Sequence, residues 1–452
     1  MTAAETTEKD GWAPGLRNAY RFVTFNALSY QIVLGSPMVL YAKHLEASAT
    51  VLGIIAGMMP LLVIFQIPAA SYIARVGYRR FYLAGWSMRV MFIFLMGLVP
   101  VTAAFLEPAS RLGLLLFLLF GFNLSRGISS AAWLPWITAL VPAQRRGHYL
   151  ARESACNNAA SCATLLLTGL ILGRQPGGWQ FAIVFVFSAL MGLASLAFLN
   201  RMPDVQSPAP ARENPNPVPW REIARYPPFR KLLRANFAWS MAYGGLTTFT
   251  VAFLKTAAGM TADKVLYVTA LSYLGGLGGL VLFGTRLDRH GSKPVLTVTL
   301  LGWVGVLAGW TLLAAKALAP RWGVILALQL AMGLGYAVYQ MANTRLAMAT
   351  VPVMGREHFF ALFSVVANLT LGIAPMFWGL LIDAFGPHEF RGLGLALNQF
   401  SFFFLLVTLA YAATLAFCRR LEEPRAANVE ALLRDLLAQT PLRSWVRFWP
   451  RG

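Results

Sequence analysis

One arginine lies in the middle of a long apolar stretch, where a charged side chain is costly. Arg126 falls within the hydrophobic block that begins at Leu112, and a charge at the centre of a bilayer costs between about 2.5 and 17 kcal/mol. Asn123, Ser130 and Trp133 lie at helical spacings from it and predict one polar face. A guanidinium there offers a forked donor to a carboxylate or phosphate, so we expect a cavity that binds an anionic group. The alternative is an arginine neutralised by carbonyls or by a neighbouring helix.

A second polar stripe lies farther along the chain. Tyr336, Gln340 and Asn343 follow one another at spacings of four and three residues, and an internal repeat of the sequence makes them the other wall of the predicted pocket. Two other intramembrane arginines, Arg345 and Arg89, are weaker candidates, because we expect their long side chains to reach the membrane interface.

The elements that position these residues are transmembrane helices. Of the 452 residues, 57% are hydrophobic and 12% are charged, whereas soluble domains carry about 25% charged residues. The apolar residues form blocks long enough to cross a hydrocarbon core of about 30 Å as helices. The sequence predicts an all-α polytopic membrane protein with twelve spans, centred near residues 32, 62, 93, 127, 165, 189, 246, 275, 305, 337, 371 and 406.

The positive charges divide unevenly between the two sides of these spans. The termini and even-numbered connections hold 27 Lys and Arg residues, and the odd-numbered connections hold 8. Because positive residues accumulate on the cytoplasmic side, we expect both termini to be cytoplasmic in a bacterial inner membrane. The net charge of +20 would otherwise suit a nucleic-acid binder, but this distribution argues against one.

Breaks in the apolar pattern predict five regions. A proline-rich stretch between the sixth and seventh blocks predicts a solvated linker, and the mixture of aromatic and basic residues from Trp220 suits contact with anionic lipid headgroups. A tail from Ala426 has the pattern of an amphipathic helix on the cytoplasmic leaflet. The predicted regions are a cytoplasmic N-terminal segment (1–17), a six-helix bundle (18–200), the linker (201–234), a second six-helix bundle (235–418) and a basic amphipathic tail (419–452).

The two bundles are related by an internal repeat. A shift of 210 residues aligns the segment from Ala139 with the segment from Ala349, and seven of sixteen positions match. Six crossings return the chain to the same side, so the halves are parallel repeats about an axis along the membrane normal. Such halves can exchange two packings at little energetic difference, which favours transport by alternating access.

A motif after the second helix of each half resembles the major facilitator superfamily, whose signature there reads roughly GxxxDRxGRR. The second half has GTRLDRHGSKP, and the first half has AASYIARVGYRR with Ala74 in place of the aspartate. The resemblance covers nearly the whole chain and implies a conformational latch between the cytoplasmic bundle ends; the alternative is a set of positive-inside anchors with a turn glycine. The residues concerned are Gly284, Asp288, Arg289, Gly291, Lys293, Arg75, Gly77, Arg79 and Arg80.

The resemblance also implies that the first and seventh helices face the cavity, which adds Asn26, Tyr30 and Tyr243 to the predicted substrate contacts. Buried polar residues in spans more often join helices, which is the alternative for these three. No Asp or Glu lies near the middle of a span, so uniport, anion exchange or coupling through the substrate's own charge is favoured over carboxylate-based proton symport.

These patterns predict a monomeric secondary transporter of a small solute, with an organic anion as the favoured cargo. Efflux of amphiphilic drugs or lipids and a transport-inactive membrane scaffold remain alternatives. The sequence indicates no enzyme, because no nucleophile with a base or pair of carboxylates is apparent. It also indicates no cofactor and no metal, since Cys156, Cys162 and Cys418 lack ligand spacing.

Overall fold

A computed structural model describes residues 16–141, 146–205, 223, 225–350, 356–392, 395–423 and 427–438. This part of the chain contains twelve helical segments that are long and apolar enough to cross a membrane, and each predicted centre falls in a different one, so the predicted fold class is confirmed. The predicted N-terminal segment up to residue 15, the linker residues 206–222 and 224 and the tail after residue 438 lie outside the described residues.

The chain clusters into two compact units. Unit 1 comprises residues 1–47, 58–214 and 260–267, and unit 2 comprises residues 48–57, 215–259 and 268–452. Residues 48–57, at the start of the second span, therefore cluster with the second half of the chain, and residues 260–267, at the start of the eighth span, cluster with the first half. The domain boundaries drawn from the sequence remain predictions.

Unit 1 contains the first six spans, several of which are interrupted helices. Its elements are α1 (Leu16–Leu34), α2 (Ser36–His44), the last turn of α3 (Ala49–Leu62), the 3₁₀ turn η2 (Val63–Phe65), α4 (Gln66–Val76), α5 (Tyr78–Leu98), η3 (Val101–Ala104), α6 (Pro108–Ser129), η4 (Ser130–Ala132), α7 (Trp133–Leu140), α8 (Arg146–Leu172) and α9 (Gly178–Leu199).

Proline and glycine explain two of these interruptions. Pro37 occupies the first turn of α2 directly after Gly35, and proline is tolerated at a helix start because its missing N–H needs no partner there. In the fourth span, η4 separates α6 from α7 just before Pro135. Ser130 and Trp133 therefore do not continue the α-helical face that carries Arg126, because a 3₁₀ turn advances by three residues per turn and not 3.6.

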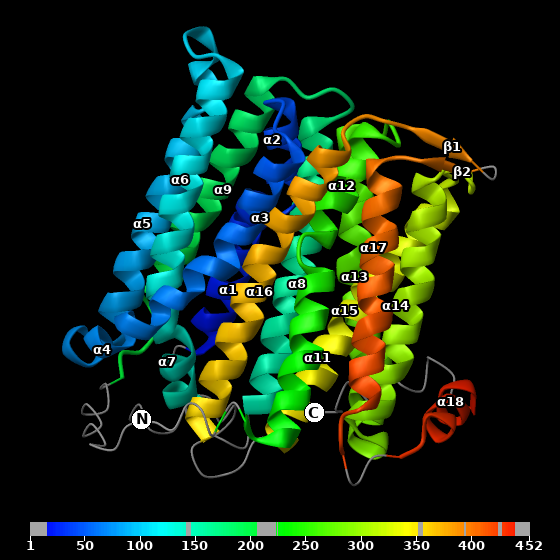
Figure 1. Cartoon of the computed structure of the whole chain (residues 1–452). Coiled ribbons are helices and arrows are strands. Elements are labelled where there is room, and N and C mark those ends of the chain that lie inside the picture. The colour runs from blue at the N-terminus through cyan, green and yellow to red at the C-terminus, as the bar shows by residue number, and fades with distance from the viewer. Residues whose placement is uncertain are drawn as a thin grey trace. The chain divides into compact units, whose positions relative to one another are not determined.

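Unit 2 contains the remaining spans and the tail. Figure 1 shows α14 and α17 of this unit side by side, and they share the most extensive contact among the helices that the structure describes. The elements are α11 (Pro227–Tyr243), α12 (Leu246–Thr256), α13 (Ala262–His290), α14 (Ser292–Ala314), α15 (Trp322–Thr350), α16 (Arg356–Phe385), β1 (Phe390–Gly392), β2 (Leu395–Leu397), α17 (Gln399–Arg419) and α18 (Val429–Ala438).

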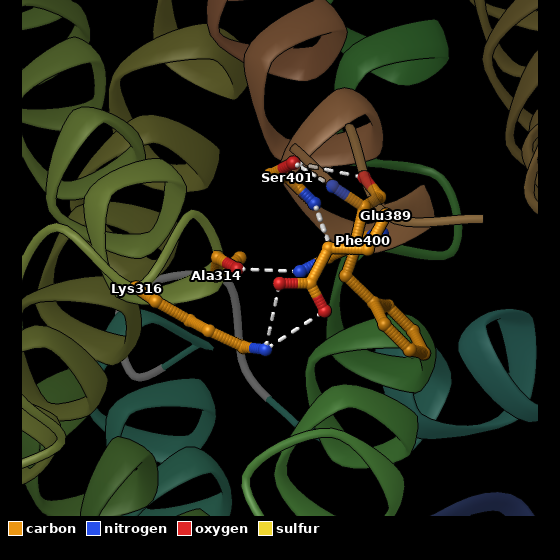
Figure 2. A network of polar contacts seen from close by, with 6 residues as sticks. Ala314, Lys316, Glu389, Phe400 and Ser401 are labelled. Atoms are coloured by element: carbon orange, nitrogen blue, oxygen red, sulfur yellow. Dashed lines mark hydrogen bonds and ion pairs between the residues drawn. The ribbon is translucent and has the colours of Figure 1, made fainter. Parts of the chain in front are cut away.

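A polar network joins the end of α14 to the start of α17 (Figure 2). The strands β1 and β2 pair antiparallel just before α17, and the Asn398 side chain caps α17 by accepting from the backbone N–H groups of Phe400 and Ser401. Asn398 also donates to the carbonyl of Ala314 at 2.7 Å. Lys316 pairs with Glu389 at 2.9 Å. These contacts fasten the α16–α17 connection to the end of α14.

The start of α3 is held within unit 2 by a carboxylate of α16. Asp383 accepts hydrogen bonds from the backbone N–H groups of Ala49 at 2.9 Å and Thr50 at 2.7 Å, and from the Thr50 hydroxyl at 2.6 Å. A carboxylate is favourable at a helix N-terminus because it satisfies free N–H groups and complements the helix dipole. Asp383 thus ties the first turn of α3 to α16.

Candidate functional site

Unit 1 contains two arginines inside the membrane span, on neighbouring helices. Arg126 of α6 is half-buried, and Arg89 of α5 is 4% exposed. They lie close enough for their positive charges to repel each other. Arg89 was expected to reach the interface, but its guanidinium instead lies 3.2 Å from the centroid of the Trp86 ring. Within the described part of the chain, neither arginine forms an ion pair.

Aromatic residues surround this pair of cations. Trp133 packs against Phe22 and Tyr82, with ring centroids 5.0 Å and 5.2 Å apart, and Tyr82 stacks on Trp86 at 6.3 Å. The ring faces carry negative potential, so they stabilise nearby cations partially without neutralising them. Trp133 also hydrogen-bonds the carboxylate of Glu153, a half-buried residue near the start of α8.

The other predicted contacts of unit 1 make local hydrogen bonds. Tyr30 donates to the side-chain oxygen of Asn157 at 2.7 Å, and Ser130 donates to the carbonyl of Gly127 at 3.1 Å. Asn123 is 1% exposed and donates to the carbonyl of Leu119 in its own helix at 2.9 Å. The side-chain oxygens of Asn123 and Asn26 are buried without a partner. Tyr30 also interacts electrostatically with Arg126.

The predicted contacts of unit 2 form an aromatic stack without charge. Tyr243 stacks on Trp239 and on Tyr336, with ring centroids 4.9 Å and 4.8 Å apart, and the centroids of Trp239 and Tyr336 are themselves 6.3 Å apart. Trp239 also stacks on Tyr339 at 4.3 Å. Trp303 meets the edge of Tyr243 at 6.2 Å. Such stacks gain both from burial of area and from the ring quadrupoles. The unit therefore presents flat apolar faces with phenol groups.

Two amide side chains flank this stack. Gln340 donates to the Tyr336 hydroxyl at 3.2 Å. Asn343 is 7% exposed and donates to the side-chain oxygen of Asn236 at 3.3 Å, which joins α15 to α11. Tyr336 is 37% exposed and is the most accessible of the large residues in the stack. Substrate contact by these residues remains a prediction.

The latch motif has turn glycines in both units. Gly77 and Gly291 have φ of 85° and 88° between consecutive helices, a region that side-chain-bearing residues rarely adopt. Arg79 donates to the side-chain oxygen of Asn200 at 2.8 Å. The Asp288 side chain lies outside the described residues. The other motif positions are exposed or half-buried and make no contact that identifies a latch: Arg75, Arg80, Gly284, Arg289 and Lys293. The latch role therefore stays a prediction.

The sequence reasoning missed Arg286, which lies within the same motif. Arg286 is 2% exposed and pairs with Asp435 of α18 at 3.0 Å. Glu423 caps α14 by accepting from the N–H groups of Ser292 at 3.0 Å and Lys293 at 2.7 Å. The tail thus fastens the α13–α14 turn. The sequence shows Arg286 two residues before the motif aspartate, Asp288, but its partner Asp435 lies 149 residues away.

The aromatic neighbours were also missed. Trp239, Tyr339 and Trp86 complete the two clusters, and only their helical spacing from Tyr243, Tyr336 and Arg89 could have indicated them. In the described residues no group of three or more His, Cys, Asp or Glu side chains lies together to hold a metal ion.

Comparison with known proteins agrees with this architecture. An efflux pump of the MFS type from Mycolicibacterium smegmatis is 27% identical over 362 residues, which cover 78% of this chain and 80% of the pump. A D-xylose–proton symporter has a TM-score of 0.69 at 14% identity and covers 90% of this chain and 97% of its own. A bacterial homologue of the human lysosomal transporter Spinster has a TM-score of 0.62 at 13% identity, covering 97% and 98%.

The nucleoside transporter NupG has a TM-score of 0.61 at 14% identity and covers 90% of this chain and 99% of its own. At these identities the solved structures show the shared fold alone. The family model of the Major Facilitator Superfamily matches residues 22–314 and 249–452, and so nearly the whole length. The chain is therefore an integral membrane transporter that belongs to the Major Facilitator Superfamily.

Proposed function

We propose that this transporter moves a small organic anion by alternating access, and that Arg126, aided by Arg89, binds the anionic group. The observation that supports it is the unbalanced positive charge in unit 1. Arg89 is buried and Arg126 half-buried, and no ion pair of either is found among the described residues. A desolvated charge without a partner is unfavourable, so an anion that enters gains the interaction that the protein leaves open.

The surroundings suit a planar or aromatic anion. A carboxylate or phosphate accepts two parallel hydrogen bonds from a guanidinium. Tyr30 and Tyr82 interact electrostatically with Arg126, and the Tyr82 hydroxyl offers a further donor. Trp133 offers an aromatic edge in the same cluster. Recognition of the charged group and of an attached ring would then come from one unit.

Thermal unfolding of the purified protein, followed by tryptophan fluorescence, tests this proposal. Mono- and dicarboxylates, organic phosphates, neutral sugars and nucleosides are screened against the wild type, Arg126→Gln and the control Arg419→Gln, which removes an exposed arginine at the end of α17. An anion at 100 times its Kd adds about 2.7 kcal/mol of stability. We expect this gain in the wild type and in Arg419→Gln, and not in Arg126→Gln.

Equal stabilisation of Arg126→Gln by the anions would remove Arg126 from recognition. Stabilisation by neutral sugars or nucleosides alone would overturn the anion class. A hit is then carried into proteoliposomes, where uptake of the labelled anion must saturate and must be lost in Arg126→Gln.

Efflux of amphiphiles is the second candidate, because the curated relative is an efflux pump. The uncharged stack of Trp239, Tyr243 and Tyr336 would suit a flat apolar ligand. Cells that express the chain should then accumulate less of a fluorescent amphiphile than cells with an empty vector. Tyr336→Ala should abolish this difference, whereas Arg126→Gln should leave it unchanged.

A further inference from the structure

Unit 2 contains a groove of 410 Å³ that the proposed anion site does not use. Its volume falls within the range of about 300 to 1,000 Å³ that is typical of small-molecule sites. Three helices form its walls, α11, α16 and α17. The lining side chains are almost all apolar: Leu233, Phe237, Ala238, Met241, Val366, Ala410, Ala413 and Phe417, with Arg230 and Arg234 completing the set.

Small residues open the groove and aromatic residues border it. Ala410 and Ala413 of α17 are three residues apart and so lie on one side of the helix. Phe237 of α11 is 54% exposed, which places an apolar ring where it would contact hydrocarbon chains. A groove with such walls suits an acyl chain.

The groove extends about as deep as one membrane leaflet. Arg230 lies in the first turn of α11, close to the start of the span at Pro227. Met241 is 11 residues farther along, which corresponds to about 16 Å at the rise of an α-helix. Half of a hydrocarbon core of about 30 Å is about 15 Å. The arginines thus lie at the membrane surface and Met241 near the midplane.

The shallow end of the groove has uncompensated positive charge. Arg230 and Arg234 are one helical turn apart, and both are exposed. Neither side chain has an ion pair or hydrogen-bond partner in the described portion of the chain. The neighbouring Lys231, in contrast, pairs with Glu422. The two guanidinium groups match the anionic headgroup of an acidic lipid, and the apolar groove next to them matches its acyl chain.

We propose that this groove binds one acidic phospholipid from the leaflet in which α11 begins. The phosphate of the headgroup, which carries the negative charge, contacts Arg230 and Arg234, and an acyl chain lies along Phe237, Met241 and Ala413. Arginine binds phosphate oxygens through its forked donors, and basic residues near an anionic membrane surface add attraction for acidic lipids.

The equivalent surface of unit 1 is built differently. Tyr20 and Thr24 lie 210 positions before Arg230 and Arg234 and supply no positive charge. Tyr20 stacks on Tyr149 with ring centroids 5.1 Å apart, and the guanidinium of Arg152 lies 5.0 Å from the Tyr20 ring centroid. The repeat therefore does not reproduce the lipid site, and we expect one such lipid per chain.

Native mass spectrometry of the full-length protein in dodecyl maltoside tests the proposal. The probes are phosphatidylglycerol and phosphatidylcholine with identical palmitoyl and oleoyl chains. We expect the wild type to bind one phosphatidylglycerol in preference to phosphatidylcholine. Arg230→Gln with Arg234→Gln should weaken phosphatidylglycerol binding by about 30-fold, at the strength typical of two basic residues near an anionic surface, and should leave phosphatidylcholine binding unchanged.

Two further variants separate the groove from general charge attraction. Ala413→Phe fills the groove while it keeps both arginines, so it should weaken binding of both lipids. Arg419→Gln with Arg420→Gln removes two exposed arginines that do not line the groove, and should retain wild-type binding. Arg126→Gln should also retain it, so that this proposal and the anion proposal can fail independently.

The proposal is overturned if phosphatidylcholine binds as tightly as phosphatidylglycerol. It is also overturned if the Arg230 and Arg234 double variant keeps its phosphatidylglycerol affinity, or if the Arg419 and Arg420 control loses as much affinity as that variant.

Discussion

The buried and half-buried arginines of the two units differ in whether a carboxylate pairs with them. In unit 2, Arg286 pairs with Asp435 at 3.0 Å, and the two side chains are 3% and 18% exposed. In unit 1, Arg89 and Arg126 lie near each other, and the described residues provide no carboxylate partner for either. A balanced pair supports structure, whereas an unbalanced pair leaves interactions open for a ligand. The contrast indicates which cations serve the fold and which serve binding.

Equivalent positions of the repeat carry different chemistry. Arg126 and Tyr336 are 210 positions apart, as are Asn26 and Asn236. The asparagines remain the same type, but a charged site in unit 1 corresponds to an aromatic stack in unit 2. The repeat therefore preserves the helical framework while each unit has its own side chains at the equivalent site.

The aromatic stack is expected to be a structural core. Trp239 is 2% exposed and lies against both Tyr243 and Tyr339, so Trp239→Ala should lower the free energy of unfolding by about 3 to 5 kcal/mol. Denaturant titration of the purified protein measures this loss. Phe237→Ala, on an exposed part of the same helix, should cost far less. Equal losses in the two variants would remove the structural role of the stack.

The balanced arginine is expected to depend on its partner. Asp435→Asn leaves the Arg286 charge unpaired and buried, and should cost about 3 kcal/mol of stability. Glu430→Gln is the matched control, because Glu430 lies exposed on the same helix α18. Thermal unfolding compares both variants with the wild type. A loss in Glu430→Gln as large as in Asp435→Asn would contradict a specific pair.

The unbalanced arginine is expected to affect binding and not folding. Arg126→Gln should reduce affinity for the transported anion by about 10- to 100-fold, the value of one to two charged hydrogen bonds, without lowering the stability of the ligand-free protein. Tyr336→Phe, at the equivalent position of unit 2, removes no charge and should change the affinity less than threefold, which corresponds to about 0.6 kcal/mol. Isothermal titration calorimetry measures both. Loss of ligand-free stability in Arg126→Gln would mean that this arginine, too, is structural.

The smallest effect concerns the exposed pair of Lys231 and Glu422. The hydrogen bond and charge of Lys231 hold the pKa of Glu422 below its ordinary value, so the pair stabilises the folded protein above the ordinary glutamate pKa of about 4.3. This contribution is lost as the pH falls through the lowered pKa. The difference in melting temperature between wild type and Glu422→Gln should be present at pH 7 and disappear in acid. A difference that does not change with pH would show that the pair is not responsible.

Local patterns were sufficient for the membrane architecture. The cost of burying backbone polar groups in hydrocarbon forces each long apolar block into a helix, so the twelve spans follow from hydropathy alone. The parallel repeat and the motif around Gly291 then predicted the family, and the positive φ at Gly77 and Gly291 agrees with the expected turns. These features depend on residues that are neighbours in the sequence, which is why they are visible without coordinates.

The tertiary structure decided which polar side chains are paired. Helical periodicity placed Arg126 on a polar face, but it did not show that Arg89 lies on Trp86 or that Arg286 has a partner in α18. It also did not reveal the groove beside Arg230 and Arg234. The Arg286 pair and the groove join elements that are far apart in sequence, whereas Arg89 and Trp86 lie three residues apart on α5 and only the side-chain conformations show their contact. Periodicity assigns a side chain to a face, whereas packing decides whether that face meets a carboxylate, a ring or lipid.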